Sequence, residues 1–447
     1  MDLSDFVWGA ATSAYQIEGG RLEGGKGESI WDRFADIGRM PESGDVACDH
    51  YNRWEEDVAL MADLGLDGYR FSIAWTRVLP DGRGKVNQEG LDFYDRLVDG
   101  LLAAGITPYP TLYHWDLPQT LEDDGGWTNR ATVDAFVEYT ESVVARLGDR
   151  VKHWITHNEP WVATFLGHLD GVFAPGRASW DEALAAGHHI LLSHGRAVPV
   201  LRDGGAEKVG IALDCRAVYP ASGSAEDVAA CRHFDGFRNR WFYDPVFGKG
   251  YPQDMLEAYR ARGRFEGATI PANQPGDLDE IAVPIDFLGL NYYTSIPISA
   301  ARGDETEDTG VPAGPNPPDG HTEMGWPITP NALTEFLERI NNEWEPESIY
   351  ITENGASYST GVDEGGRVRD QERIEYLDSH IAAVAAARER GVPVDGYFVW
   401  SLLDNLEWVE GYRQRFGIIH VDHATGTRTP KDSYYWYRNR INDGMAG

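Results

Sequence analysis

Lysine is scarce in this chain of 447 residues: 72 acidic residues stand against 39 basic ones, which gives a formal net charge of -33. Such a charge makes nucleic acid, anionic membranes and acidic polymers poor partners. A carboxylate-rich, lysine-poor surface suits concentrated salt, where counterions screen self-repulsion. We therefore expect a halophilic protein, with an ordinary acidic protein from a GC-rich genome as the alternative. Lysine occurs only at Lys26, Lys85, Lys152, Lys208, Lys249 and Lys431.

Cysteine is equally rare, and long apolar runs are missing. Cys48, Cys215 and Cys231 show no paired spacing, which argues against a disulfide framework or a metal cluster and favours a reducing compartment. The first residues, MDLSDF, carry acidic groups where a signal peptide needs positive charge, and no segment is long enough to span a membrane. These absences predict a cytoplasmic protein without a membrane partner, and they leave a homo-oligomer open.

Helical periodicity alternates along the chain with short apolar runs. Apolar residues recur at three- and four-residue steps over 133–147, over 93–101 before Gly105, and over 374–384 before Gly391. The apolar runs are short and rich in residues that favour strands buried on both faces. They are FVWGAAT (6–12), YRFSIAW (69–75), TPYPTLYHW (107–115), VKHWITHNEP (151–160), VGIALD (209–214), DFLGLNYY (286–293), SIYITENG (348–355) and DGYFVWSLLDN (395–405).

Eight such strands alternating with helices predict one α/β domain over residues 1–447, a single (β/α)8 TIM barrel. Uneven spacing predicts extended βα loops at 13–50, 215–255 and 295–330. A doubly wound open sheet is the alternative, but no glycine-rich nucleotide loop follows any of the strands. His188, His189 and His194 fall in a predicted helix without metal-ligand spacing, so we interpret them as structural. Four tryptophans are interpreted as packing residues: Trp8, Trp31, Trp54 and Trp75.

Polar and aromatic residues stand at the carboxyl ends of the predicted strands, the ends that face the active site of a barrel. Two of them, Glu159 and Glu353, form a carboxylate pair of the kind that performs acid/base or glycoside chemistry. Taken singly, either glutamate would more often be a solvated or ion-paired residue. The strand that ends near Asp214 offers no clear candidate. The other candidates are Gln16, Arg70, His114, Trp115, Asn158, Asn291, Tyr293, Asn354 and Trp400.

Several long motifs in this order resemble glycoside hydrolase family 1, the β-glucosidase and β-galactosidase family. They are FVWGAATSAYQIEG, YRFSIAW, TLYHWDLPQ, THNEP, DFLGLNYYT, ITENG and WSLLDNLEWVEGYRQRFGI, and together they cover essentially the whole chain. The resemblance implies a retaining, exo-acting β-glycosidase that uses no cofactor and no metal. Its expected substrates are small β-glycosides or oligosaccharides, with glucose preferred and with galactose and fucose as side activities.

The resemblance also implies roles for individual residues. Glu159 of THNEP would be the acid/base and Glu353 of ITENG the nucleophile. Arg70 and Tyr293 would contact the nucleophile and keep it ionised, while Glu159 would hold a proton in the resting enzyme. The two carboxyl groups should lie about 5 Å apart, as in retaining enzymes. Asn291 is expected to belong to the same catalytic group.

The sugar itself would be held by a mixed set of polar and aromatic side chains in the innermost subsite. Asn158 should bond the 2-hydroxyl. Glu407 should accept from the 4- and 6-hydroxyls and repel a 6-phosphate, which predicts a neutral sugar. Phe416 could line the sugar site or pack in the core. The remaining residues of this subsite are Gln16, His114, Trp115, Trp400 and Trp408.

Three alternative functions remain open. A non-catalytic carbohydrate-binding relative would keep the pocket but lose the chemistry, and the presence of both Glu159 and Glu353 argues against it. A 6-phospho-β-glycosidase is disfavoured by Glu407 and by the absence of the phosphate-binding Ser-Lys-Tyr set. An enzyme that mainly transfers glycosyl groups would use the same residues.

Overall fold

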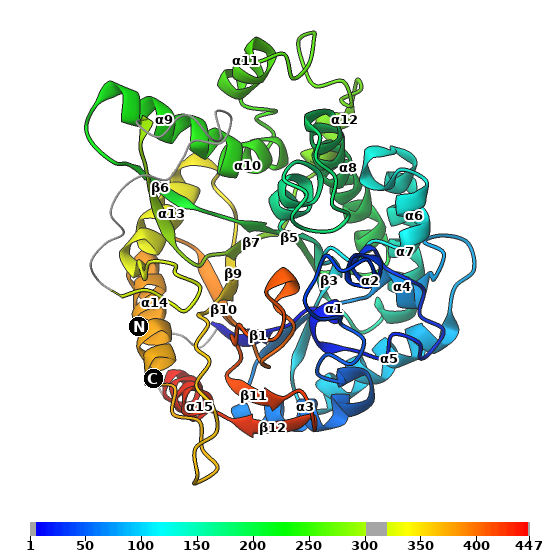
Figure 1. Ribbon diagram of the computed structural model, residues 1–447, viewed down its shortest axis with the longest axis vertical. Coiled ribbons are helices and arrows are strands. Elements are labelled where there is room, and N and C mark those ends of the chain that lie inside the picture. Colours follow the sequence, from blue (N-terminus) through cyan, green and yellow to red (C-terminus); the bar gives the residue numbers. More distant parts are fainter. Residues whose placement is uncertain (1–5, 301–319, 446–447) are drawn as a thin grey trace.

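The computed structural model describes residues 6–300 and 320–445. Eight parallel strands close into a barrel in the order β1-β10-β9-β7-β5-β4-β3-β2, and helices surround it (Figure 1). The predicted (β/α)8 barrel is therefore confirmed. The barrel strands are β1 (Val7–Ala11), β2 (Gly68–Ser72), β3 (Thr107–Tyr113), β4 (His153–Asn158), β5 (Lys208–Asp214), β7 (Phe287–Asn291), β9 (Ile349–Asn354) and β10 (Val394–Trp400).

Each barrel strand falls within, or within one residue of, a run identified from its apolar residues. Several runs extend too far at the carboxyl end: Trp75, for example, begins the short helix α4 (Trp75–Val78). The inner faces of the strands form a compact cluster that fills the barrel. Its buried members are Ala11, Tyr109, Ile155, Ala212, Phe287, Tyr350, Phe398, Trp400 and Phe416.

The outer helices bury one apolar stripe each against the strands, as the periodicity predicts. Two of them stop where glycine allows a left-handed backbone, at Gly105 (φ 77°) and Gly391 (φ 89°). α7 packs against α8, and α13 packs against α14. The principal helices are α3 (His50–Leu64), α5 (Gln88–Ala103), α7 (Ala131–Leu147), α8 (Trp180–Asp203), α13 (Pro330–Glu343), α14 (Gln371–Glu389) and α15 (Asp432–Met445).

The expected long βα connections carry additional secondary structure. Segment 13–50 contains α1 (Ala14–Ile17) and α2 (Ile30–Asp36), and α2 begins with a capping box between Ser29 and Asp32. Segment 295–330 contains β8 (Ser295–Ile298), and its central part lies outside the described residues. Segment 215–255 is largely helical, with β6 (Ala217–Pro220), α9 (Ala225–Asp235), the π-helix η3 (Gly236–Arg240), α10 (Trp241–Val246) and the start of α11 (Gln253–Ala261).

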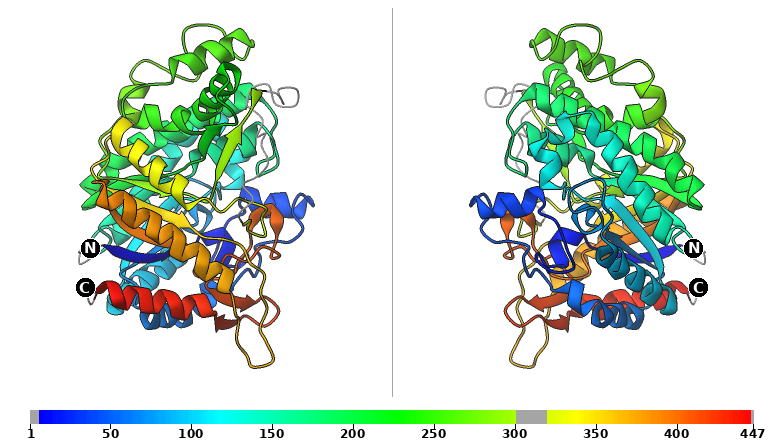
Figure 2. Two further views of the ribbon diagram at one scale, coloured as in Figure 1. Left: turned by 90° about the vertical axis from the view of Figure 1, so that its left-hand side faces the viewer. Right: turned by 90° about the vertical axis from the view of Figure 1, so that its right-hand side faces the viewer.

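The remaining elements are short and lie between the strands or after them. β11 and β12 pair antiparallel, and β6 pairs with β8. In the side views, α2 lies at the end of the barrel away from the two ends of the chain (Figure 2). These elements are α6 (Gln119–Asp123), η1 (Gly126–Thr128), η2 (Val162–Leu166), α12 (Asp277–Ile281), η5 (Trp408–Glu410), β11 (Ile419–Asp422) and β12 (Thr427–Pro430).

The residues interpreted as structural have structural partners. His188 contacts the Tyr251 hydroxyl at 2.9 Å and Asp277 at 2.9 Å, and it is fully buried. The three thiols are unpaired and buried. Within the described part of the chain, no helix has the length and apolarity that crossing a membrane would require. The same residues contain no group of three or more side chains placed to hold a metal ion.

Candidate active site

Both glutamates identified from the motifs lie at the carboxyl end of the barrel, each beside an irregularity in its strand. Between Ile155 and Asn158, β4 has one residue more than the facing stretch of β5. Leu290 and Asn291 are consecutive in β7, but one extra residue separates their partners in β9, Ile351 and Glu353. A bulge of this kind re-aims the side chains that follow it. Glu159 also has a left-handed backbone, with φ 45°.

Glu353 is held by a cation and a hydroxyl donor. Arg70 donates from Nη1 to Oε1 at 2.5 Å, and the Tyr293 hydroxyl donates to Oε2 at 2.7 Å. Burial raises the pKa of Glu353, while Arg70, Tyr293 and Asn291 oppose that rise by stabilising the charged form. The contacts expected for Arg70 and Tyr293 are therefore present, and they favour an ionised carboxylate.

Glu159 lies in a different environment, in which no cation of the described residues is bonded to it. The Asn291 amide donates to its Oε1 at 2.8 Å. Burial raises the pKa of Glu159 well above its usual range, and the nearby carboxylates Asp214 and Glu353 raise it further. When the two glutamates share one proton, Glu159 is therefore the group that holds it.

Asn158 connects the two halves of this constellation. Its Oδ1 accepts from Arg70 Nη2 at 2.6 Å and from Asn291 Nδ2 at 2.9 Å. Its Nδ2 lies 3.1 Å from His114 Nε2. Burial lowers the pKa of His114 well below its usual range, with Arg70 contributing, so the imidazole is neutral. A neutral ring that accepts at Nε2 carries its proton on Nδ1, which leaves that atom as a donor.

Aromatic rings form one wall of the site. Trp115 and Trp408 have centroids 4.6 Å apart, and His114 is stacked with Trp400 and with Trp408, each at 6.0 Å. Trp115 (φ 79°) and Trp408 (φ 47°) share the left-handed backbone of Glu159. Strained conformations of this kind persist where the surrounding structure fixes them, and they gather at functional sites.

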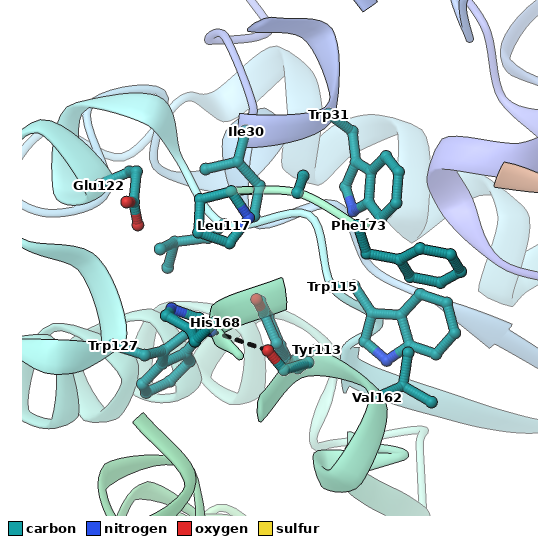
Figure 3. A pocket seen from close by; sticks show the side chains of 13 residues that line it. Ile30, Trp31, Tyr113, Trp115, Leu117, Glu122, Trp127, Val162, His168 and Phe173 are labelled. Atoms are coloured by element: carbon teal, nitrogen blue, oxygen red, sulfur yellow. Dashed lines mark hydrogen bonds between the residues drawn. The ribbon is translucent and has the colours of Figure 1, made fainter. Parts of the chain in front are cut away.

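A second layer of rings supports this wall from behind. Trp31 lies 4.4 Å from Trp408 between centroids and is fully buried, in keeping with its interpretation as a packing residue. Behind Trp115, a cavity of about 10 Å³ is lined by Trp31, Phe173 and His168 among others (Figure 3). That volume suits a single water molecule, so this cavity cannot be the sugar pocket.

Gln16 and Glu407 are brought together from opposite ends of the sequence. The Gln16 amide donates to Asn405 Oδ1 at 3.1 Å and to the Leu406 carbonyl at 2.9 Å. Glu407 Oε2 is buried and has no hydrogen-bond partner among the described residues. Burial, together with Glu353 and Glu410, raises the pKa of Glu407 to about 8. An unpartnered buried acceptor is costly, and a hydroxyl donor from a ligand would satisfy it.

The match to known proteins decides which family this architecture represents. A family model described as glycosyl hydrolase family 1 matches residues 3–445. The chain belongs to glycosyl hydrolase family 1. It is 46% identical to β-glucosidase A of Thermotoga maritima over 98% of each chain. It is 47% identical to a 1,4-β-D-glucan glucohydrolase of Thermotoga neapolitana over 99% of this chain and 98% of that one.

Solved structures of the family superpose closely on this chain. A β-glucosidase from Thermotoga maritima in complex with glucoimidazole gives a TM-score of 0.93 at 46% identity, covering 98% of both chains. An enzyme from Alicyclobacillus herbarius gives 0.95 at 45% identity over 99% of this chain and 98% of that one. The resemblance on which the sequence interpretation rests is therefore confirmed over nearly the full length.

Phe416 and Asn354 show how this family 1 chain uses two further candidates. Phe416 is buried in the cluster that fills the barrel, and its ring lies 6.1 Å from that of Tyr293 and 6.2 Å from that of Trp326. Asn354 donates to the Tyr292 carbonyl at 2.7 Å and accepts from the Tyr397 hydroxyl at 2.6 Å. The first bond ties β9 to the residue after β7 and the second ties β9 to β10, so Asn354 supports the family 1 barrel.

Two residues of the site were not recognised from the sequence. Trp326, whose centroid lies 5.5 Å from that of Tyr293, belongs to a segment predicted only as a long loop. An isolated tryptophan in a polar loop was the available signal. Asp214 ends β5 and raises the pKa of Glu159, yet it offered no motif of its own. Its position at a strand end was the available signal.

Proposed function

We propose that this family 1 enzyme is a retaining β-glucosidase in which Glu353 is the nucleophile and Glu159 the acid/base. The observation that carries the proposal is the contrast between the two buried carboxylates. Glu353 is bonded to Arg70 and Tyr293, whereas Glu159 is bonded to a neutral amide. Pairs whose surroundings separate their pKa values divide the acid and base roles between them. The relatives named β-glucosidase support glucose as the preferred sugar.

In the first step, a carboxylate oxygen of Glu353 attacks C1 of the sugar while the bond from C1 to the leaving oxygen breaks. Glu159 gives its proton to that oxygen, and a covalent glycosyl-enzyme forms. In the second step, ionised Glu159 takes a proton from water as the water oxygen attacks C1. The bond between C1 and Glu353 breaks during this attack, which releases the sugar with its original β configuration and leaves Glu353 ionised and Glu159 protonated. The proposed carboxyl separation of about 5 Å belongs to this scheme.

We propose that the remaining candidates hold the glycone. Asn158, fixed by Arg70 and Asn291, is placed to bond the 2-hydroxyl. Trp400, Trp408 and Trp115 would cover the apolar face of the ring. Gln16, His114 and Glu407 would bond the outer hydroxyls, with Phe416 packing at the edge. The same set would admit β-galactosides and β-fucosides as side activities.

The nucleophile assignment is tested by Glu353→Gly. We expect hydrolysis of an aryl β-glucoside to be lost and then restored by azide or formate, with α-glucosyl azide as the product in azide. The matched variant Glu159→Ala should instead form β-glucosyl azide, because the nucleophile is intact. Wild-type turnover in Glu353→Gly would refute the assignment. Complete inactivity of the unmodified enzyme on aryl β-glycosides would support the non-catalytic alternative instead.

We also propose the domain organisation, the cellular location, the salt adaptation and the partners of the protein. A single domain over 1–447 is supported by the closed barrel, in which β1 pairs with both β2 and β10. Three unpaired thiols support a reducing, cytoplasmic location. The net charge of -33 supports salt adaptation and argues against nucleic acid as a partner. A homo-oligomer is compatible with all of these features.

A further inference from the structure

Asp214, at the end of β5, is a buried carboxylate without a part in the mechanism above. In the barrel register Asp214 pairs with Asn291. It also lies two residues after Ala212, whose side chain belongs to the cluster inside the barrel. Alternate residues of a strand share a face, so Asp214 points into the barrel mouth beside Asn291. Asn291 is the residue that bonds Glu159.

A second charge comes from η3, which belongs to the segment after β5. Arg238 forms an ion pair with Asp214, and both side chains are buried. The guanidinium of Arg238 lies 3.5 Å from the ring centroid of Trp161, two residues after Glu159. Stacking on an indole and pairing with a carboxylate together hold an arginine in one place. The pair is therefore fixed next to the segment that carries Glu159.

Glu159 is faced by charged or titratable groups from several elements. Its backbone N–H donates to the Ala212 carbonyl at 2.8 Å, which brings the end of β4 against β5. Among the described residues, the groups that interact with the Glu159 charge are Asp214, Cys215 and Arg216 at the end of β5, Arg238 in η3, Tyr293 after β7 and Glu353 in β9. Burial is the largest influence on the proton of Glu159, and Asp214 comes next.

We propose that Asp214 is a positioning residue for the catalytic proton. Its negative charge keeps that proton on Glu159, and Arg238 sets how much of the charge Glu159 experiences. The proposal rests on the assignment of Glu159 as acid/base and deepens it. Burial raises the pKa of Asp214, but the ion pair with Arg238 and the charge of Arg216 oppose that rise. Glu159 has no such ion pair among the described residues and its pKa is raised well above its usual range, so of these two carboxyl groups Glu159 takes the proton.

Opposite shifts are expected from removing the two partners. Asp214→Asn removes a negative charge beside Glu159 and leaves Arg238. The alkaline limb of the profile of kcat/KM against pH should therefore move to lower pH by about one unit. Arg238→Gln removes the neutralising cation, so the same limb should move to higher pH. The double variant should fall between them, because both charges are gone. The acid limb, which reports Glu353, should move less in all three variants.

Two substrates with different leaving groups distinguish this role of Asp214 from a structural one. The leaving group of a dinitrophenyl glucoside departs as a phenolate and needs no proton. The kcat/KM of this substrate should therefore change little in Asp214→Asn at neutral pH. An alkyl glucoside needs the proton and should lose about tenfold at pH values above the shifted limb. Thermal melts would verify that the variants fold.

Unmoved alkaline limbs, or limbs that move in the same direction in both single variants, would overturn the proposal. A rise in KM for one leaving group with unmoved limbs would overturn it as well and make Asp214 a leaving-group contact. The azide rescue of Glu353→Gly is independent of Asp214. Its failure would reject the proposed mechanism, whereas failure of the pH shifts alone would reject only the role of Asp214.

Discussion

At the scale of single residues, the residue types at the strand ends identified candidates that the barrel brings together. The partners that each candidate bonds could not be identified from the sequence. Arg70 lies in β2, Glu353 lies in β9 and Tyr293 follows β7, and the three were grouped through the family motifs. Asp214 was passed over because its partner Arg238 lies in η3, and only the folded chain brings the two together. Such a pair leaves no local spacing to recognise.

Glu407 offers a direct test of sugar recognition at this scale. Because its buried Oε2 lacks a partner among the described residues, we expect it to accept from the sugar's 4- and 6-hydroxyls. Above pH 8, where Glu407 is ionised, Glu407→Gln should lower kcat/KM for a β-glucoside by roughly 10- to 150-fold, the value of a hydrogen bond to a charged group. A β-xyloside lacks the 6-hydroxyl and should lose less. Equal losses on both sugars would contradict the contact.

Glu407 should also determine whether the enzyme accepts phosphorylated substrates. An ionised carboxylate at this position repels a 6-phosphate, so above pH 8 the unmodified enzyme should turn over nitrophenyl glucoside and reject its 6-phosphate. Preference for the phosphate would support the phospho-glycosidase alternative.

The buried carboxyl group of Asp116 should make the stability of the protein depend on pH. Burial, with Glu18 contributing, raises the pKa of Asp116 to about 7, above its value of about 3.9 in an unfolded chain. A carboxyl group with a raised pKa stabilises the fold less as pH rises between those two values. That loss is on the order of 4 kcal/mol. Asp116→Asn should therefore gain stability relative to the unmodified protein between pH 5 and pH 8.

Urea unfolding at those two pH values measures the difference. The exposed Asp81 provides the control, since Asp81→Asn should not change the relative stability with pH. A pH-independent effect of Asp116→Asn would contradict the prediction.

At the scale of elements, strands and helices followed from periodicity, whereas the bulges in β4 and β9 did not. A bulge depends on how two strands pair, and the run of residues in one strand does not reveal it. The helices of segment 215–255 were also missed. α9 is short and only partly buried, so its apolar stripe is weak.

Thr352 lies at the bulge in β9 and supports the site through its bond to Asn291. Its hydroxyl donates to Asn291 Oδ1 at 2.7 Å, which orients the Asn291 amide toward Glu159 and Asn158. Thr352→Val keeps the shape but removes the donor. It should cost about 1 kcal/mol of stability and lower kcat/KM about tenfold, because Glu159, the proposed acid/base, loses its fixed partner. Thr352→Ser should retain most of the activity, and equal losses in both variants would contradict this role.

At the scale of the whole molecule, composition predicted properties that geometry does not test. Arginine-carboxylate pairs occur on the outside, such as Arg150 with Asp99 and Asp149. Salt weakens exposed pairs of this kind, each worth about 0–1 kcal/mol. Salt also screens the repulsion that accompanies a net charge of -33. The second effect involves far more charge and should prevail.

We therefore expect the melting temperature to rise by several degrees between low salt and molar potassium chloride. Choline chloride at equal ionic strength should act similarly, because screening does not depend on the cation. A melting temperature that stays constant or falls would contradict salt adaptation and favour the ordinary acidic protein.

Gln16, just after β1, bonds the Leu406 carbonyl, which directly precedes Glu407 and Trp408 in the segment beyond β10. During translation the chain therefore carries Glu159 and Glu353, the proposed acid/base and nucleophile, before Trp400, Glu407 and Trp408 have been synthesised. Two fragments divided between these parts would each lack half of the sugar-binding residues. We expect reassembly of the two fragments to restore glycoside cleavage, so that activity would report the association of proteins fused to them.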